Sequence, residues 1–137
     1  MTNYSTYVDW RRTFHQYPEL SDEEYKTTEK LRKILKSYGI RILEVPLKTG
    51  LVAEIGQGEE MIAVRTDIDA LPIEEQVKHE FTSKHHGAMH ACGHDIHMAS
   101  ILATGIQLKE IEDELNGRVR LIFQPAEELG HGAFEII

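Results

Sequence analysis

Hydrophobic residues at helical spacing open the chain. Tyr7, Trp10 and Phe14 lie three or four positions apart, as they would on one face of an α-helix. Because Pro18 cannot continue a helix, the pattern predicts a first amphipathic helix over residues 5–16. Its hydrophobic face is expected to pack against the core.

A second helical pattern follows. Ser21 and Glu24 have the spacing of a capping box, in which the hydroxyl accepts an amide hydrogen bond and the carboxylate reaches back to the start of the helix. We expect the helix to end at Gly39, because glycine is common just after a helix. The buried face is expected to consist of four hydrophobic residues: Leu31, Ile34, Leu35 and Tyr38.

Short hydrophobic runs farther along predict β-strands. The apolar run 61–64 is typical of a central strand buried on both faces. A helical pattern returns over residues 95–115, whereas the polar stretch 72–90 predicts a long loop with a functional role. The strands are expected at residues 40–45, 51–55, 61–68 and 118–123.

Helices that alternate with strands favour an α/β fold with a mainly parallel or mixed sheet sandwiched by helices. In such sheets, functional sites lie at the carboxyl ends of the strands. The polar clusters of this chain follow predicted strands or begin predicted helices, so we expect them to meet at one edge of the sheet.

Composition narrows the possible functions. The net charge of −8, from 15 basic and 23 acidic residues, argues against a nucleic-acid-binding surface. Neither a secretory signal nor an apolar run of about 20 residues is recognisable, so a cytoplasmic location without membrane contact is expected. Cys92 is the single cysteine, which excludes an internal disulfide and leaves a thiol-based redox protein without a resolving partner.

Six of the eight histidines lie in residues 79–97, together with the cysteine. Thiolate and imidazole groups are ligands for zinc, nickel or cobalt, and Gly93 permits a bend that lets Cys92 and His94 converge. Asp95 could orient an imidazole or begin a helix. The alternative is a buried cysteine beside a polar helix start. The histidines expected to be solvated are His79, His85 and His86.

Two further clusters contain carboxylates. Glu127 and Glu128 are either a solvated helix start or a pair in which one residue binds a metal and the other transfers a proton. Asp67 either supports a metal site or forms an ion pair with Arg65 at a strand end.

Together these segments resemble the aminoacylase-type metallopeptidases, in the branch of hippurate hydrolases, N-acyl-L-amino acid amidohydrolases and auxin-conjugate hydrolases. The resemblance implies a zinc-exopeptidase-like catalytic domain that hydrolyses N-acyl amino acids with two divalent ions, which could be zinc, manganese, nickel or cobalt. It implies Cys92, His94 and Glu128 as metal ligands, Glu127 as the general base for the metal-activated water, and Asp67 as a catalytic support. The stretches that carry the resemblance are 11–21, 65–72, 90–95 and 123–128.

The resemblance also carries an expectation about length. Members of the family continue well beyond the glutamate pair, so residues 1–137 are expected to be the N-terminal part of the catalytic domain, without the lid and dimerisation domain. Alone, this part is expected to be weakly active or inactive, and the full-length protein is expected to form a homodimer. A non-catalytic metal-binding domain is the alternative, and Glu127 argues against it because such a domain needs no base beside a ligand.

Overall fold

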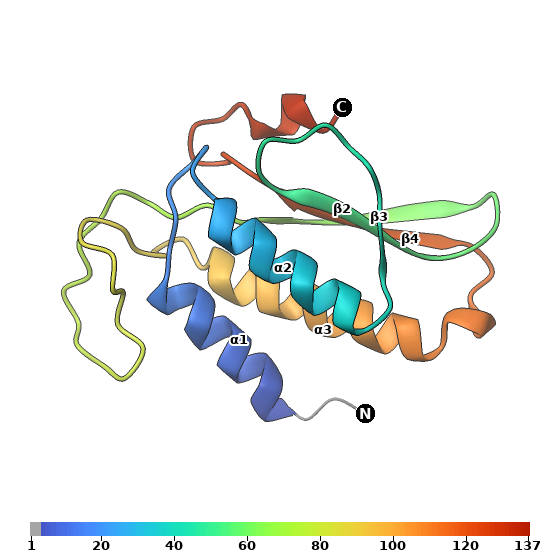
Figure 1. Ribbon diagram of the computed structural model, residues 1–137, viewed down its shortest axis with the longest axis horizontal. Helices are drawn as coiled ribbons and strands as arrows, with labels where there is room; N and C mark the ends of the chain where they lie inside the picture. Colours follow the sequence, from blue (N-terminus) through green and yellow to red (C-terminus); the bar gives the residue numbers. More distant parts are fainter. Residues whose placement is uncertain (1–3) are drawn as a thin grey trace.

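The computed structural model describes residues 4–137, in which two helices are followed by three strands, a third helix and a fourth strand (Figure 1). None of the helices in this range is long and apolar enough to cross a membrane. The elements, in chain order, are α1 (Tyr4–Gln16), α2 (Tyr25–Ser37), β1 (Arg41–Ile42), β2 (Leu51–Gly56), β3 (Met61–Asp67), α3 (His94–Glu110), the 3-10 helix η1 (Glu112–Glu114), β4 (Arg118–Gln124) and the 3-10 helix η2 (Gly132–Glu135).

The sheet is mixed, with the strand order β1-β2-β4-β3. Strand β3 is parallel to β4, and Asp67 is aligned with Gln124. Strand β2 is antiparallel to β4, and Leu51 is aligned with Phe123. The carboxyl ends of β3 and β4 and the amino end of β2 therefore meet at one edge of the sheet, as expected for the location of a site.

The helices α1, α2 and α3 all pack on one face of the sheet (Figure 1). Side chains alternate along β4, so that every second residue enters the core. The second helical layer that the resemblance implies is not among residues 4–137. The core joins β2 and β4 to the three helices through Phe14, Leu31, Leu35, Leu51, Ala53, Ile55, Met98, Leu102, Ile106, Val119, Leu121 and Phe123.

Periodicity predicted most of the elements correctly, and the expected α/β fold with a mixed sheet is confirmed. Some boundaries differ: only Arg41–Ile42 of the expected strand 40–45 forms a strand, and the expected helix 95–115 ends at Glu110 before η1. The prediction of a central β3 was wrong. Met61 and Ile62 are 44% and 65% exposed, because in the described chain β3 pairs with β4 alone.

The capping box was also a wrong prediction. Ser21 donates its hydroxyl hydrogen to Asp69 Oδ2 at 2.7 Å instead of capping the helix. Glu24 occupies the N-cap position of α2 but makes no capping hydrogen bond with its side chain. The amide of Thr27 instead donates to Glu19 Oε2 at 2.7 Å, so a residue farther back supplies the cap.

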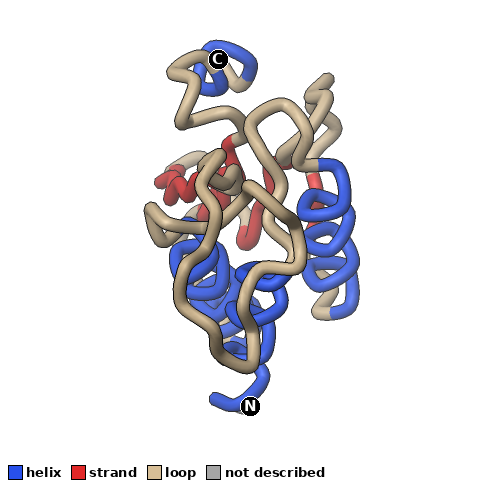
Figure 2. The backbone as a smooth tube through the Cα atoms, turned by 90° about the vertical axis from the view of Figure 1, so that its left-hand side faces the viewer, coloured by secondary structure: helices blue, strands red, loops and turns tan. Residues whose placement is uncertain are grey.

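The expected long loop between β3 and α3 lies beside the helices, and in Figure 2 it faces the viewer. Its two ends are brought together by a pair of backbone hydrogen bonds, in which Leu71 and Met89 each donate to the other at 3.0 Å. A parallel bridge between Leu20 and Ala70 attaches the start of the loop to the segment before α2. The loop therefore returns the chain to the edge of the sheet just before α3 begins.

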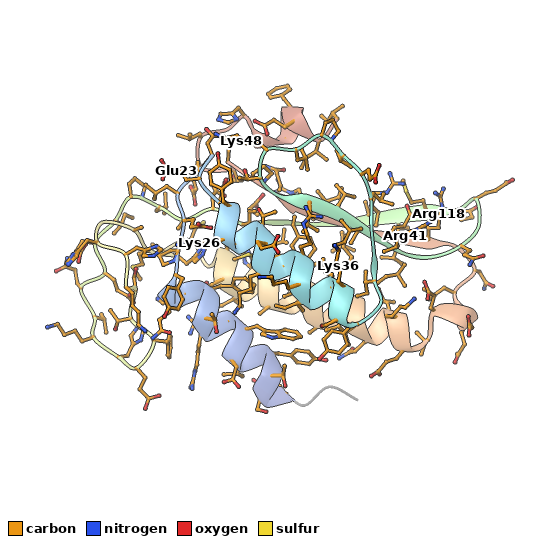
Figure 3. The ribbon with its side chains drawn as sticks, viewed as in Figure 1. Glu23, Lys26, Lys36, Arg41, Lys48 and Arg118 are labelled. Carbon is orange, nitrogen blue, oxygen red and sulfur yellow. The ribbon has the colours of Figure 1, made fainter. Side chains whose placement is uncertain are left out.

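A cluster of arginines surrounds Glu54 at another part of the sheet. Arg120 Nη2 lies 2.7 Å from Glu54 Oε2, and Arg41 and Arg118 also pair with this carboxylate. The hydrogen bond from Arg120 lowers the pKa of Glu54. In Figure 3, Arg41 and Arg118 lie on the right-hand side of the molecule, whereas Glu23, which precedes α2, lies at the upper left. This ion cluster stabilises the sheet away from the candidate site.

Candidate metal centre

The strand ends bring four carboxylates to one place. Asp67 is the last residue of β3, and Glu127 and Glu128 follow the end of β4 by a few residues. Because β3 and β4 are parallel and end in register, the segments that leave them are adjacent. Asp69 belongs to the segment that leaves β3, and its Oδ2 accepts a hydrogen bond from the amide of Glu128 at 2.9 Å.

Cys92 and His94 reach the same edge through the loop that precedes α3. After the paired segment at Leu71 and Met89, the chain turns sharply at Gly93, whose φ of +91° lies in the left-handed region that glycine adopts without steric cost. Helix α3 begins immediately afterwards at His94. The Cys92-Gly93-His94 step thus directs a thiol and an imidazole to one site, as the sequence predicted.

His94 is the central side chain of this site and is only 3% exposed. Its Nδ1 lies 2.8 Å from the backbone carbonyl oxygen of Asp69, to which it donates a hydrogen bond. This contact fixes the ring so that Nε2 faces the remaining carboxylates. Nε2 is 4.0 Å from Asp67 Oδ2, 3.8 Å from Glu127 Oε2 and 3.9 Å from Glu128 Oε1.

The charges around His94 favour its protonated form when no metal is bound. Burial alone would lower the pKa of His94, but the contacts with Asp69 and the negative charge of Asp67 raise it to about 9. Burial likewise acts to raise the pKa of Asp69, but hydrogen bonds from His94, the Glu128 amide and Ser21 lower it to about 2. The site is therefore a cluster of acidic side chains with a cationic imidazole at its centre.

Two other groups have pKa values that are shifted in favour of their neutral forms. Burial raises the pKa of Asp67, partly offset by the positive charges of Arg65 and His94. Desolvation and the nearby charges of Glu128 and Glu127 raise the pKa of the Cys92 thiol. Cys92 consequently keeps its proton in the absence of a cation, because a thiolate would lie beside several carboxylates.

The residues present fit a divalent ion. Donor atoms of Cys92, His94 and Glu128 lie within 4.8 Å of one another, and those of Asp67, His94 and Glu127 form a second such group that shares the imidazole. Glu128 Oε1 is buried and has no hydrogen-bond partner among residues 4–137, which leaves it free to bind a cation. A thiolate, an imidazole and a carboxylate form a donor set that zinc and related metals accept.

The structure brings together all five side chains singled out from the sequence: Asp67, Cys92, His94, Glu127 and Glu128. Their individual roles remain predictions. The sequence reasoning missed Asp69, although its position two residues after Asp67 at a strand end was an available signal.

Asp95, which the sequence suggested could orient a metal-binding imidazole, contacts another histidine. Asp95 is buried, accepts a hydrogen bond from His15 Nδ1 at 2.8 Å and forms an ion pair with Arg11, whose Nε lies 2.9 Å from its Oδ2, so it orients His15 and not His94. The other ring nitrogen of His15 lies 3.0 Å from Glu75. The loop histidines have partners away from the centre: His79 with Glu75, His85 with the carbonyl of Pro18, and His86 with Glu74.

A protein-family model described as Peptidase family M20/M25/M40 matches residues 63–137, which include the whole candidate centre. The chain is 54% identical over 129 residues to N-acetyl-L-cysteine deacetylase from Bacillus subtilis, covering 93% of the chain and 31% of that protein. It is 45% identical over 130 residues to N-acyl-L-amino acid amidohydrolase from Geobacillus stearothermophilus, covering 93% of the chain and 35% of that protein.

Among solved structures, a dinuclear metal-binding peptidase of the M20 family from Bacillus subtilis matches with a TM-score of 0.93 and 51% identity, over 96% of this chain and 38% of that one. An aminohydrolase structure from methicillin-resistant Staphylococcus aureus matches with a TM-score of 0.91 and 36% identity, over 96% and 36% of the two chains. The chain thus spans about a third of the length of the relatives that it matches.

Proposed function

Since the chain belongs to peptidase family M20/M25/M40, we propose that the protein is a metal-dependent amidohydrolase that cleaves the amide bond of N-acyl amino acids. The observation that carries this proposal is the convergence of the Cys92, His94 and Glu128 donor atoms beside Glu127. The names of two similar proteins, a deacetylase of N-acetyl-L-cysteine and an N-acyl-L-amino acid amidohydrolase, support the substrate class.

We assign Cys92, His94 and Glu128 as the residues that would hold divalent metal. A similar structure is described as dinuclear, which supports two ions, and the mixed donor set suits zinc, manganese, nickel or cobalt. Such ions supply two kinds of chemistry, since they lower the pKa of water and polarise a carbonyl group.

Glu127 is assigned as the general base. Its side chain is 39% exposed, compared with 19% for Glu128, so it is the more accessible of the pair to water and substrate. Its carboxylate would accept a proton from the attacking water and return it to the amide nitrogen, which leaves as the amine of the amino acid. The products are a carboxylic acid and a free amino acid.

Asp67 is assigned as a support for this centre. It lies 4.0 Å from His94 Nε2 and 3.1 Å from Arg65 Nη1, so its charge bears on the imidazole while the guanidinium limits its movement. A homodimer and a cytoplasmic location, both expected from the sequence, remain predictions.

The two adjacent glutamates test the assignment in the intact protein, with N-acetyl-L-cysteine as the probe and the release of free amine as the readout. Glu127→Gln should keep its metal and lose about 10²–10⁴-fold in kcat, because an amide cannot accept the proton of water. Glu128→Gln should lose metal affinity first and recover part of its activity in excess metal.

Glu114→Gln provides the control, since Glu114 is an exposed glutamate of η1. This variant should match the wild type in metal content and turnover. The roles are reversed if Glu127→Gln loses metal while Glu128→Gln retains it. A wild-type protein that binds metal but releases no amine from any N-acyl amino acid would favour the non-catalytic metal-binding domain.

A further inference from the structure

The carboxyl group of Glu24 lies in the interior next to the end of β4, although it belongs to the start of α2. Glu24 is 0% exposed, and both of its carboxyl oxygens have hydrogen-bond donors. Oε1 accepts from the amide of Ala126 at 2.8 Å, and Oε2 accepts from the hydroxyl of Thr49 at 2.8 Å. Burial raises the pKa of Glu24, because the charged carboxylate is costly to bury. The hydrogen bonds from Ala126 and Thr49 offset part of this cost.

The amide that donates its hydrogen bond to Glu24 belongs to Ala126, a residue with an unusual backbone conformation. Ala126 has a φ of +48°, in the left-handed region, which is sterically unfavourable for a residue with a Cβ. Ala126 is also 0% exposed, so its amide cannot bond to water and would be unsatisfied without Glu24. The Glu24 carboxyl therefore stabilises the turn through which the chain leaves β4.

This turn determines where the two functional glutamates lie. Glu127 and Glu128 follow Ala126 directly, and the amide of Glu128 is held in turn by Asp69 Oδ2 at 2.9 Å. The segment is thus fixed at both ends by carboxyl groups from other parts of the chain. Between these two contacts, the carboxylates of Glu127 and Glu128 reach to within 3.8 and 3.9 Å of His94 Nε2.

We propose that Glu24 is a positioning residue of the metal centre, which acts through the Ala126 amide to place Glu127 and Glu128 beside His94. The role of Glu127 as base comes from the proposed function. The placement of Glu128 can be measured by metal binding alone, whatever the reaction.

This role requires a side chain that is long enough to place an acceptor oxygen at the Ala126 amide, and it does not require a negative charge. Glu24→Gln keeps an oxygen at the right distance for the Ala126 amide and offers its NH₂ group to the Thr49 hydroxyl. Glu24→Asp keeps the acid but shortens the side chain by about 1.5 Å, the length of one carbon–carbon bond, and loses the contact with Ala126. Glu24→Met keeps the length and removes the acceptor.

The experiment titrates Co²⁺ into the metal-free intact protein and follows the thiolate-to-cobalt absorption that Cys92 would give. Glu24→Gln should bind Co²⁺ as the wild type does. Glu24→Asp and Glu24→Met should bind about 10–100-fold more weakly, the usual effect of removing a support of metal ligands. At saturating metal, kcat for N-acetyl-L-cysteine should also fall by at least about tenfold, because a displacement near 1 Å can cost about 10²-fold.

Glu19→Asp is the matched control. Glu19 is also a glutamate that accepts from backbone amides, at the start of α2, but it does not contact Ala126 in the described structure. Its shortening should lower the unfolding free energy in urea without changing the affinity for Co²⁺.

The positioning role is refuted if Glu24→Asp and Glu24→Met lose stability as Glu19→Asp does but keep the wild-type affinity for Co²⁺. It is also refuted if Glu24→Gln binds as weakly as Glu24→Asp, since charge would then be the property required. If Glu24→Gln folds but neither of the other variants does, Glu24 serves folding alone. Absence of hydrolysis by the wild type would reject the amidohydrolase function while the Co²⁺ affinities still decide the role of Glu24.

Discussion

The contact between His94 and Asp69 makes the stability of the metal-free protein depend on pH. The pKa of His94 is raised from 6.5 to about 9, mainly by Asp69 and Asp67 acting against burial. The folded state therefore holds this proton more tightly than the unfolded state does. Its stabilising effect is complete below about pH 6.5 and is lost as the pH rises to about 9. We predict that the unfolding free energy of the metal-free protein falls over this interval.

The magnitude follows from the size of the pKa change. Each pKa unit corresponds to about 1.4 kcal/mol, so a rise from 6.5 to about 9 gives a loss of about 3–4 kcal/mol. The pKa of Asp69 falls from 3.8 to about 2, which corresponds to about 2 kcal/mol that is lost as the pH drops through this range. The two values describe largely the same interaction and are not added. His94 gives the larger value because it also faces Asp67.

Urea unfolding of chelator-treated protein at a series of pH values would measure this loss. A metal held by His94, as we propose, would displace this proton, so the metal-loaded protein should not show the fall. His94→Gln should abolish the fall in the metal-free protein. His97→Gln should retain it, because His97 is an exposed residue on the same helix. A flat profile for the metal-free wild type, or an unchanged fall in His94→Gln, would refute the reasoning.

Two other substitutions give direct tests. Cys92→Ser should lower the metal content after dialysis, because an alcohol is a poor ligand. It should also reduce the number of protons released on metal uptake near pH 7 by about one, because the thiol loses its proton when it binds. Unchanged metal stoichiometry and unchanged proton release in calorimetry would show that Cys92 is not a ligand. Gly50→Ala should destabilise the protein in urea by about 1–3 kcal/mol more than Gly87→Ala. Both positions have positive φ, but a Cβ at Gly50 would lie 2.5 Å from the carbonyl oxygen of Phe123, whereas one at Gly87 meets no described atom within 4 Å. Equal effects would contradict the packing at the end of β4.

Local sequence patterns predicted the elements and the chemical groups of the candidate site. Helices α1 and α2 follow from the spacing of hydrophobic residues, which decides which face of a helix can be buried. Cys92, His94 and the glutamate pair stood out because thiol, imidazole and carboxylate groups near strand ends and helix starts are the types that bind metal. Such features are carried by a few neighbouring residues and need no knowledge of the rest of the fold.

The features that the sequence did not predict depend on contacts between distant segments. Glu24 bonds to an amide 102 positions away, and nothing near Glu24 distinguishes this contact from a helix cap. The exposed position of β3 depends on the order of strands in the sheet. An apolar run does not indicate this order, because it can occur both in a central strand and in an edge strand. Asp69 stands near a strand end in the sequence, but its contacts with His94 and with the Glu128 amide follow only from the parallel, in-register pairing of β3 and β4.

The candidate centre divides into a buried part that fixes geometry and an accessible part that can meet a ligand. His94, Asp69 and Glu24 are each at most 3% exposed, whereas Cys92 is exposed and the Glu127 side chain is 39% exposed. A change in the buried part disturbs packed or charged contacts, so it alters stability together with metal binding. A change at Cys92 or Glu127 removes little buried structure, so binding or turnover should respond while the fold stays intact. Stability and chemistry can therefore be separated at these two accessible positions, and they cannot be separated at His94.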